Sequence, residues 1–184
     1  MIELKNISVF FDQKPVLENI SALFPKEGLV LITGPSGSGK TTLVNVILGL
    51  VKPTCGEVLL NGAGLSAVFQ EDRLVPTLTA AENVLLVSNK TETEKRLEQM
   101  KLIDAKEKYP AELSGGMKRR VAIARALSVP FDVLVLDEAF AGIDEPLARE
   151  IIGEILAEYP DKLIIAVTHR PELFEGTGYL VLSL

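Results

Sequence analysis

The stretch GLVLITGPSGSGKTTLVNVILGL, residues 28–50, decides the fold. In its first part, GLVLITG, the apolar residues run together instead of alternating, which is typical of a central strand covered on both faces. Its last part, from Lys40 onward, predicts a helix. A buried strand that leads through a glycine-rich loop into a helix indicates an α/β fold with a mainly parallel central sheet.

The loop between this strand and this helix fits phosphate binding. Gly34, Gly39, Lys40 and Thr41 match the pattern G-x-x-x-x-G-K-[ST]. Glycines let backbone N–H groups converge on phosphate oxygens, and the helix dipole adds positive potential. We expect Lys40 to reach the β- and γ-phosphates and Thr41 to offer its hydroxyl to Mg²⁺; a chance glycine-rich turn would lack the flanking strand and helix. The candidate phosphate-binding residues are Gly34, Pro35, Ser36, Gly37, Ser38, Gly39, Lys40, Thr41 and Thr42.

A second apolar strand with an acidic end supplies groups that triphosphate hydrolysis needs. The segment VLVLDEAF, residues 133–140, ends its apolar run at Asp137, where parallel neighbours would bring this carboxylate beside the phosphate loop. We expect Asp137 to hold Mg²⁺ and Glu138 to polarise the attacking water, a role worth roughly two to four orders of magnitude in rate. Alone, Glu138 would more simply be an exposed acid at a strand end, but its place next to Asp137 favours the catalytic role.

Two further polar residues are expected at the same edge of the sheet. His169 is the only histidine and ends a third apolar strand, KLIIAVTHR at residues 162–170. A lone histidine is usually structural, but parallel strands would turn this one toward the γ-phosphate, so a catalytic role is favoured. Gln70 follows another strand, and its amide either ligates Mg²⁺ or orients water; the sequence leaves this choice open.

The segment LSGGMKRR, residues 113–120, has two interpretations. In the simpler one, Ser114 caps a helix and Gly115-Gly116 forms a tight entry to it. In the functional one, the Ser hydroxyl, the glycine N–H groups and the helix N-terminus form a second anion site. One γ-phosphate cannot easily use both this site and the first loop within one small subunit, whereas two subunits placed head to tail could share it.

Composition limits the class of protein. A chain of 184 residues, 47% of them hydrophobic, predicts one compact unit. Its formal net charge of -6 argues against binding to nucleic acid or anionic lipid, and the single cysteine, Cys55, excludes an intrachain disulfide. The sequence shows no signal peptide and no spanning helix, so we expect no direct membrane insertion; at a membrane, another chain would supply the spanning part.

The remaining elements are predicted from local patterns. Residues 2–11 and 16–24 read as antiparallel strands, and EVLLNG (57–62) and LSAVFQ (65–70) as a further pair that completes this first sheet, joined by a turn at Asn61-Gly62. The capping box of Thr79 and Glu82 predicts a helix start. Further helices are expected at 91–102, from Ser114 onward and after Asp144, with a last strand at 178–184.

Together these motifs resemble the ATP-binding cassette (ABC) family, the ATPase subunits of ABC transporters, over nearly the whole chain. They occur in the family's order: the phosphate loop at 34–42, the Q-loop at Gln70, the signature at 113–117, the acidic strand ending at Asp137-Glu138, the D-loop at 141–144 and the switch histidine His169. The resemblance implies one domain, residues 1–184. It would have a P-loop NTPase core, an N-terminal antiparallel β subdomain and a small helical subdomain at about 71–128.

The resemblance also implies how the two glycine motifs work. In the family, ATP is sandwiched between the phosphate loop of one subunit and the signature of the other, so Ser114, Gly115 and Gly116 would hold the γ-phosphate of a nucleotide bound by a partner molecule. Phe11 aligns with the aromatic residue that stacks on adenine. The implied cofactors are ATP and Mg²⁺. The implied partners are a second ATPase subunit, in a homo- or heterodimer, and an integral membrane permease docked near the Q-loop.

Within the family, VFQEDRLVPTLTAAENV (68–84) is most similar to importer ATPases of the nitrate, sulfonate and taurine group. This implies a cytoplasmic location at the inner face of the cell membrane, through the permease. Three positions depart from common family residues: Met117 stands where Gln is frequent, Ala139 where Pro is common and Ala141 where Ser often occurs. The last departure is expected to weaken a contact across the dimer.

Three alternatives remain open at this point. One is an ABC ATPase without a permease, acting in an accessory or assembly role. Another is a small P-loop kinase, which would leave LSGGM and His169 unexplained. The third is a nucleotide-gated scaffold that hydrolyses nothing.

Overall fold

The computed structural model describes residues 1–184 and contains a parallel sheet with the strand order β5-β6-β7-β3-β8. β3 lies between β7 and β8, and both neighbours run parallel to it, with Leu31 paired to Ala166 on one side and to Val181 on the other. The unbroken apolar run of the sequence therefore forms an inner strand, as predicted. The strands are β3 (Gly28–Thr33), β5 (Leu65–Val68), β6 (Val133–Asp137), β7 (Leu163–Val167) and β8 (Tyr179–Ser183).

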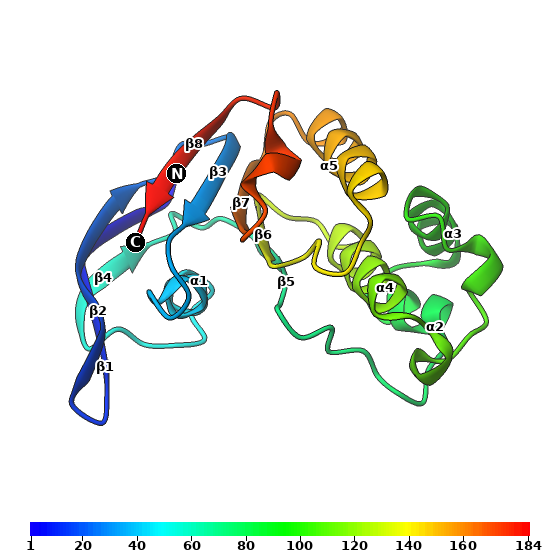
Figure 1. The fold of residues 1–184 in the computed structure, drawn as a ribbon, viewed down its shortest axis with the longest axis horizontal. Coiled ribbons are helices and arrows are strands. Elements are labelled where there is room, and N and C mark those ends of the chain that lie inside the picture. The colour runs from blue at the N-terminus through cyan, green and yellow to red at the C-terminus, as the bar shows by residue number, and fades with distance from the viewer.

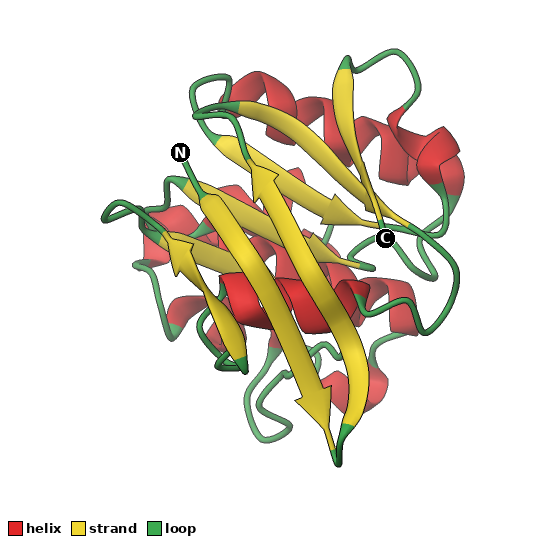
Figure 2. Ribbon diagram, turned by 90° about the vertical axis from the view of Figure 1, so that its left-hand side faces the viewer, coloured by secondary structure: helices red, strands yellow, loops and turns green.

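A separate antiparallel sheet flanks the parallel one. It has the order β2-β1-β4 and consists of β1 (Glu3–Phe11), β2 (Lys14–Leu23) and β4 (Cys55–Leu59). β1 and β2 form a hairpin whose turn residues, Asp12 and Gln13, both have positive φ, 49° and 64°. Turns of this handedness match the right-handed twist of the paired strands. Figure 2 shows this sheet facing the viewer, with helices behind it.

One strand of the expected first sheet lies elsewhere. β4 pairs with β1 as predicted, but β5 crosses to the parallel sheet and pairs with β6, so the interpretation of residues 57–70 as a strand pair was wrong. Asn61 and Gly62 do have the positive φ of a turn, 50° and 77°. A turn signal fixes the local backbone, however, and not the edge that the next strand joins. Here Gly64 exchanges hydrogen bonds with Asp132, which anchors the start of β5 beside that of β6.

The inner strands of the parallel sheet, β3, β6 and β7, are buried on both faces. On one face, Val30 and Ile32 pack with α1 (Lys40–Ile47) and the antiparallel sheet in a core of 17 buried residues. On the other face, Leu29 and Leu31 join a core of 30 buried residues that includes α4 (Gly115–Leu127) and α5 (Glu145–Glu158). Successive side chains of a strand point to opposite faces, so one continuous apolar strand serves both cores.

Two further helices pack on α4 at the end of the molecule away from the β1–β2 hairpin (Figure 1). They are α2 (Ala80–Leu85) and α3 (Lys90–Gln99). The predicted capping box at the start of α2 is confirmed, with Glu82 N–H donating to Thr79 Oγ1 at 3.2 Å and Thr79 N–H to Glu82 Oε2 at 2.8 Å. The helices α2, α3 and α4 fall within residues 71–128, although their apolar side chains share the larger sheet core. The subdomain boundary thus stays a prediction.

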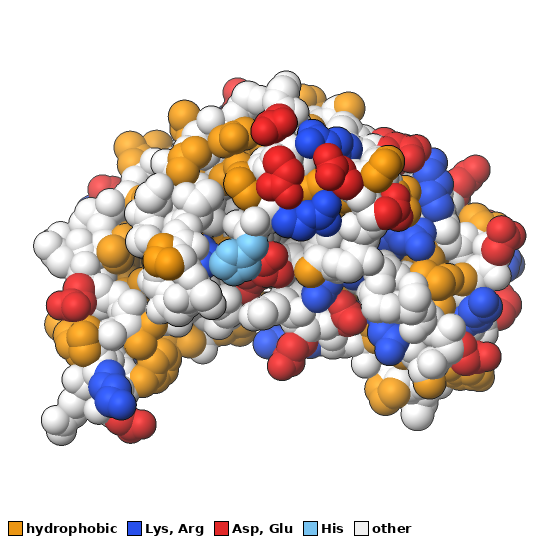
Figure 3. All heavy atoms as spheres, in the orientation of Figure 1, with side chains coloured by type: hydrophobic (Ala, Val, Ile, Leu, Met, Phe, Trp, Pro, Cys, Tyr) orange, Lys and Arg blue, Asp and Glu red, His pale blue; other side chains and the backbone are white.

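The molecule as a whole is an arch. In the space-filling view its surface is hollowed on the side between the β1–β2 hairpin and the helices α2 and α3 (Figure 3). Three short 3₁₀ helices complete the chain, at Ile103–Ala105, Pro110–Glu112 and Pro171–Phe174. None of the helices has both the length and the apolar character needed to cross a membrane.

An ion-pair cluster ties α3 to the end of α5. The Arg96 guanidinium is buried and donates to Glu92 on its own helix at 2.6 Å and to Glu158 on α5 at 2.7 Å. It also donates to the Tyr159 hydroxyl at 2.6 Å. Partial burial alone would raise the pKa of Glu158, but the hydrogen bonds from Arg96 and Lys95 outweigh it and lower this pKa from 4.5 to about 2.

Replacing Glu158 with Gln should destabilise the fold by about 1–2 kcal/mol at pH 7, because the buried Arg96 loses a charged hydrogen-bond acceptor. Urea unfolding measures the change. Since the folded state lowers the pKa of Glu158, its contribution is present above pH 4.5, the value in the unfolded chain, and is lost as the pH falls toward 2. The difference between wild type and Glu158→Gln should therefore shrink between pH 5 and pH 2.

The matched control is Glu154→Gln on the same helix. This partly exposed carboxylate lies 3.9 Å from Lys101, a distance at which a surface pair contributes little. The control should change the unfolding free energy by less than about 0.5 kcal/mol. Equal losses in both variants, or a loss in Glu158→Gln that is the same at every pH, would contradict the proposed role of the cluster.

Candidate functional site

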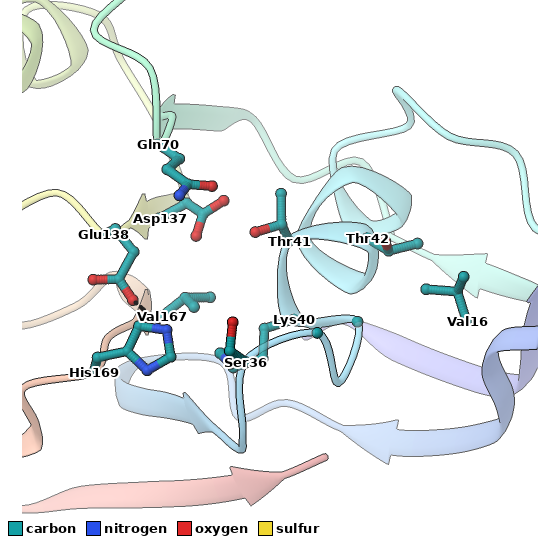
Figure 4. A pocket seen from close by; sticks show the side chains of 12 residues that line it. Val16, Ser36, Lys40, Thr41, Thr42, Gln70, Asp137, Glu138, Val167 and His169 are labelled. Carbon is teal, nitrogen blue, oxygen red and sulfur yellow. Dashed lines mark ion pairs between the residues drawn. The ribbon is translucent and has the colours of Figure 1, made fainter.

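A pocket of about 260 Å³ lies where the carboxyl ends of β6 and β7 meet the loop that follows β3. In Figure 4, Gln70 and Asp137 lie side by side opposite Thr41 at the start of α1, and His169 lies beside Glu138. Only two of the twelve lining residues are hydrophobic. The pocket therefore suits a polar, charged ligand. Its lining consists of Val16, Ser36, Gly37, Gly39, Lys40, Thr41, Thr42, Gln70, Asp137, Glu138, Val167 and His169.

Glycine is required at two positions of the loop. Gly39 has a φ of 93°, and a Cβ there would come within 2.8 Å of the Val16 carbonyl oxygen. Gly34 has a φ of 147°, and a Cβ there would lie 2.6 Å from the Leu184 carbonyl oxygen. Side chains at either position would clash with the backbone on which the loop rests, so glycine is needed for this loop conformation.

Lys40 closes the loop on itself. Its ammonium group donates to the carbonyl oxygens of Gly34 at 2.9 Å and Pro35 at 2.8 Å, and the residue is only 6% exposed. No carboxylate forms an ion pair with it. A buried cation at the N-terminus of a helix, with no carboxylate in direct contact, is a strong binding group for an anion such as phosphate.

The two acidic residues lie in different surroundings. Burial raises the pKa of Asp137, against a hydrogen bond with Thr41 and the charges of Lys40 and Arg119. Burial also raises the pKa of Glu138, against the charge of His169. Asp137 and Glu138, which are adjacent in the sequence, thus both have pKa values above their ordinary values, so both take up a proton more readily.

Glu138 is held in a strained backbone conformation. Its φ is 51°, which is uncommon for a residue with a side chain, and its N–H donates to the Val167 carbonyl oxygen at 3.0 Å. Its Oε1 lies 3.6 Å from His169 Nε2 and is buried without a hydrogen-bond partner. Strain of this kind persists where the surrounding structure fixes a side chain for a task. The arrangement points a carboxylate that can accept a proton into the pocket.

The donor set fits Mg²⁺. Asp137 is 2% exposed, and its Oδ1 is buried with no hydrogen-bond partner, so an oxygen ligand is available. The Thr41 hydroxyl and the Gln70 side chain line the same pocket and add hard oxygen donors. No group of three or more His, Cys, Asp or Glu residues is placed to hold a metal alone. Mg²⁺ commonly binds in this way, through one or two carboxylates together with substrate phosphates.

Most of the predicted site residues are brought together. Of the predicted loop, Ser36, Gly37, Gly39, Lys40, Thr41 and Thr42 line the pocket, while Gly34, Pro35 and Ser38 shape the loop behind it. Gln70, Asp137, Glu138 and His169 line it as well. Sequence reasoning missed Val16 and Val167. Val16 comes from β2, and no pattern in its own segment indicates the contact with Gly39.

Phe11 does not reach this lining. It lies at the end of β1, beside the hairpin turn, and is 50% exposed. Its stacking on adenine stays a prediction. Because β1 and β2 are paired, Phe11 and Val16 lie on the same hairpin, and only Val16 contacts the pocket.

The segment from Ser114 to Gly116 lies outside the pocket. Met117 N–H donates to Ser114 Oγ at 3.2 Å, so the predicted helix cap is confirmed. Ser114 and Gly115 are exposed, and the N-terminus of α4 is open to solvent. A Cβ at Gly116 would lie 2.6 Å from the Gly142 carbonyl oxygen, which explains the second glycine by close backbone approach. The chain thus carries two glycine-rich helix starts, and only one of them lines the pocket.

Comparison with known proteins gives a consistent result. A family model described as "ABC transporter" matches residues 17–141. The taurine import ATP-binding protein TauB of Rhizobium johnstonii is 36% identical, and the alignment covers 100% of this chain and 79% of that protein. The bicarbonate transport ATP-binding protein CmpD of a Synechocystis strain is 38% identical over 84% of this chain and 62% of that protein. The chain is thus shorter than these curated relatives.

Solved structures match as well. The ATP-binding cassette MJ0796, in a dimeric post-hydrolysis state bound to ADP and Pi, is 31% identical with a TM-score of 0.83, covering 94% of this chain and 90% of that one. A second dimeric structure of MJ0796, described as a bacterial ABC transporter cassette, has a TM-score of 0.86 at 29% identity and covers 100% and 94% of the two chains.

Replacing Lys40 with Ala should weaken the binding of a nucleoside triphosphate by about 10- to 100-fold, because the phosphate loses a charged hydrogen-bond donor. Titration with a fluorescent nucleotide measures the affinity. Lys52→Ala is the matched control, since it removes the same charge from an exposed position outside the pocket. The assignment of the loop as the phosphate site is wrong if the two substitutions weaken binding equally.

Proposed function

This chain belongs to the ABC transporter family, and on that premise we propose that it is the ATP-hydrolysing subunit of an importer that powers a separate membrane permease. Its relatives include import ATP-binding proteins for taurine and bicarbonate, which supports an importer of the nitrate, sulfonate and taurine group. ATP and Mg²⁺ are the ligands of the family, and the pocket has the donor groups for both.

The observation that carries the proposal is the separation of the two glycine-rich helix starts. The loop before α1 lines the pocket, whereas Ser114 and Gly115 at the start of α4 face solvent. A helix N-terminus with exposed glycine N–H groups and a serine hydroxyl whose hydrogen is still available to donate binds anions well. A second chain placed head to tail would bring its Ser114 segment over the nucleotide in the first chain's pocket. ATP would then join two subunits and form two equivalent sites.

The pocket residues divide the work of hydrolysis. Lys40 and the loop N–H groups would hold the β- and γ-phosphates and neutralise their charge. Glu138 would accept the proton of the attacking water, and its raised pKa favours this transfer. His169, 3.6 Å from Glu138, would orient the water and the γ-phosphate. Thr41, Asp137 and Gln70 would hold Mg²⁺, which when bound supplies positive charge to the phosphate oxygens.

To drive transport, the conformational change caused by ATP hydrolysis would have to be passed on to a membrane protein. No helix of this chain is long and apolar enough to span a bilayer, and we propose that a permease supplies the spanning part. We propose that the permease docks near Gln70 and that this subunit works at the inner face of the cell membrane. Closing and opening of the dimer would move the permease between its two states.

Light scattering of Glu138→Gln with and without Mg-ATP tests the proposal. This variant removes the proton acceptor while it keeps the phosphate-binding groups, so ATP should accumulate and hold a dimer. Adding Ser114→Arg should abolish the dimer, because the bulky cation would occupy the position of the partner's γ-phosphate. Wild type should release phosphate without any acceptor molecule.

The matched control is Ser128→Arg in the Glu138→Gln background. Ser128 lies at the other end of α4 and is partly exposed there, so it adds the same charge to the same helix. This control should still dimerise with ATP. A dimer that survives Ser114→Arg would contradict the head-to-tail arrangement, and phosphate transfer to a metabolite would contradict the ATPase assignment.

A further inference from the structure

We propose that Arg119, on the helix that starts at the Ser114 segment, positions Gln70 for Mg²⁺ binding in the same chain's pocket. The proposal rests on the ATPase function above and adds a residue to it. Arg119 does not line the pocket. Its charge reaches Asp137, but its hydrogen bonds go to the backbone at Gln70, so it would position Gln70 and not touch the nucleotide.

The contacts of Arg119 are directed at the backbone of Gln70 and its neighbour. The Arg119 guanidinium donates to the carbonyl oxygen of Phe69 at 2.7 Å and to that of Gln70 at 2.6 Å. It also lies 3.2 Å from Asp72 Oδ1. Its side chain is 11% exposed. A planar guanidinium that grips two consecutive carbonyl groups fixes the position and the orientation of the peptide between them.

Residues 70–74 depend on contacts with other elements, because their own backbone forms few hydrogen bonds. β5 ends at Val68, and none of the loop backbone–backbone hydrogen bonds involves residues 70–74. Gln70 is exposed, and its side chain must nevertheless lie beside Asp137 to complete a metal site (Figure 4). The fixed points for this segment are therefore side-chain donors, and Arg119 is the one that holds Gln70 itself.

A second arginine of α4 holds the far end of the segment. Arg125 donates to the carbonyl oxygens of Asp72 at 3.2 Å and Arg73 at 3.0 Å. The Arg73 guanidinium in turn lies 3.8 Å from the centroid of the Phe69 ring. The segment from 69 to 73 is thus fastened to one helix at both ends. It would follow that helix if the helix moved.

This geometry would couple the nucleotide site of one chain to that of its partner. α4 begins at Ser114, which in the dimer would touch the nucleotide of the partner chain, and Arg119 lies about one turn further along the same helix. A displacement of α4 on closure would be passed by Arg119 to Gln70, which belongs to the metal site of its own chain. Metal binding at one site would thus depend on the engagement of the other.

Arg119→Met tests the proposal, since it keeps the apolar stem and removes the donors. The readout is the affinity for Mn²⁺, measured by electron paramagnetic resonance with the full-length chain and saturating ATP, together with the Mg²⁺ concentration at half-maximal hydrolysis. Both should shift by about tenfold toward weaker metal binding, as is typical when a group that orients a metal ligand is lost. The affinity for ATP in the presence of a chelator should stay within about twofold of wild type, because no phosphate contact is changed.

Arg120→Met is the matched control. Arg120 is the next residue of the same helix, and it also donates to two carbonyl oxygens, those of Met100 at 2.6 Å and Lys101 at 3.0 Å, away from the pocket. This variant should lower the melting temperature while leaving the metal dependence unchanged. If Arg119→Met does not fold, Arg119→Lys takes its place. Metal binding should then weaken about threefold, because a single ammonium group replaces the planar guanidinium with its several N–H donors.

A double substitution separates positioning from general damage. In a Gln70→Ala background, adding Arg119→Met should cause no further loss of metal affinity, because the group that it positions is already absent. Wild-type metal affinity in Arg119→Met, an equal shift in Arg120→Met, or full additivity with Gln70→Ala would overturn the proposal while leaving the ATPase function intact. A wild-type chain that binds neither ATP nor Mn²⁺ would overturn both.

Discussion

The site depends on one constraint, which is that parallel strands bring their carboxyl ends to the same edge of a sheet. β3, β6 and β7 end at the phosphate loop, at Asp137 and just before His169, respectively. These three segments are far apart in the sequence, and only the parallel pairing makes them neighbours. Two apolar cores hold the sheet from both faces and so keep this edge rigid. The chemistry of the pocket is therefore a consequence of the packing beneath it.

The pocket of one chain does not include the second glycine-rich helix start. It brings together the loop at 34–42, Asp137 and Glu138, which we propose bind phosphate, hold Mg²⁺ and accept a proton, but the other glycine-rich helix start of the chain faces solvent. Gly116 packs so closely on Gly142 that this helix start is fixed against the loop after Glu138. We propose that this helix start, which no group of its own chain uses, faces the pocket of a second copy. The fold of one chain thus describes half of a working unit.

Much of this could be predicted from the sequence, for physical reasons that differ between elements. The phosphate loop, the strand ending at Asp137 and the cap at Ser114 are local patterns, and each lies where the sequence placed it. β5 was assigned to the wrong sheet, because a turn at Asn61-Gly62 carries no information about the edge that the next strand joins. The contacts of Arg119 with residues 69 and 70 join positions about fifty residues apart and depend on how α4 packs. Subunit pairing lies outside the structure of one chain and follows from the family motifs.

The most direct test of the account is a mixing experiment with two inactive chains, one carrying Lys40→Ala and the other Ser114→Arg. In a dimer of either variant alone, every nucleotide site contains one defective element, so neither variant should hydrolyse ATP. In a mixed dimer, one site combines the intact phosphate loop of one chain with the intact Ser114 segment of the other. With Mg²⁺ at a saturating concentration, so that weakened metal binding does not limit the intact site, random pairing should then restore up to roughly a quarter of the wild-type rate. A mixture that stays as inactive as its components would contradict the central claim that each nucleotide site is built from two chains.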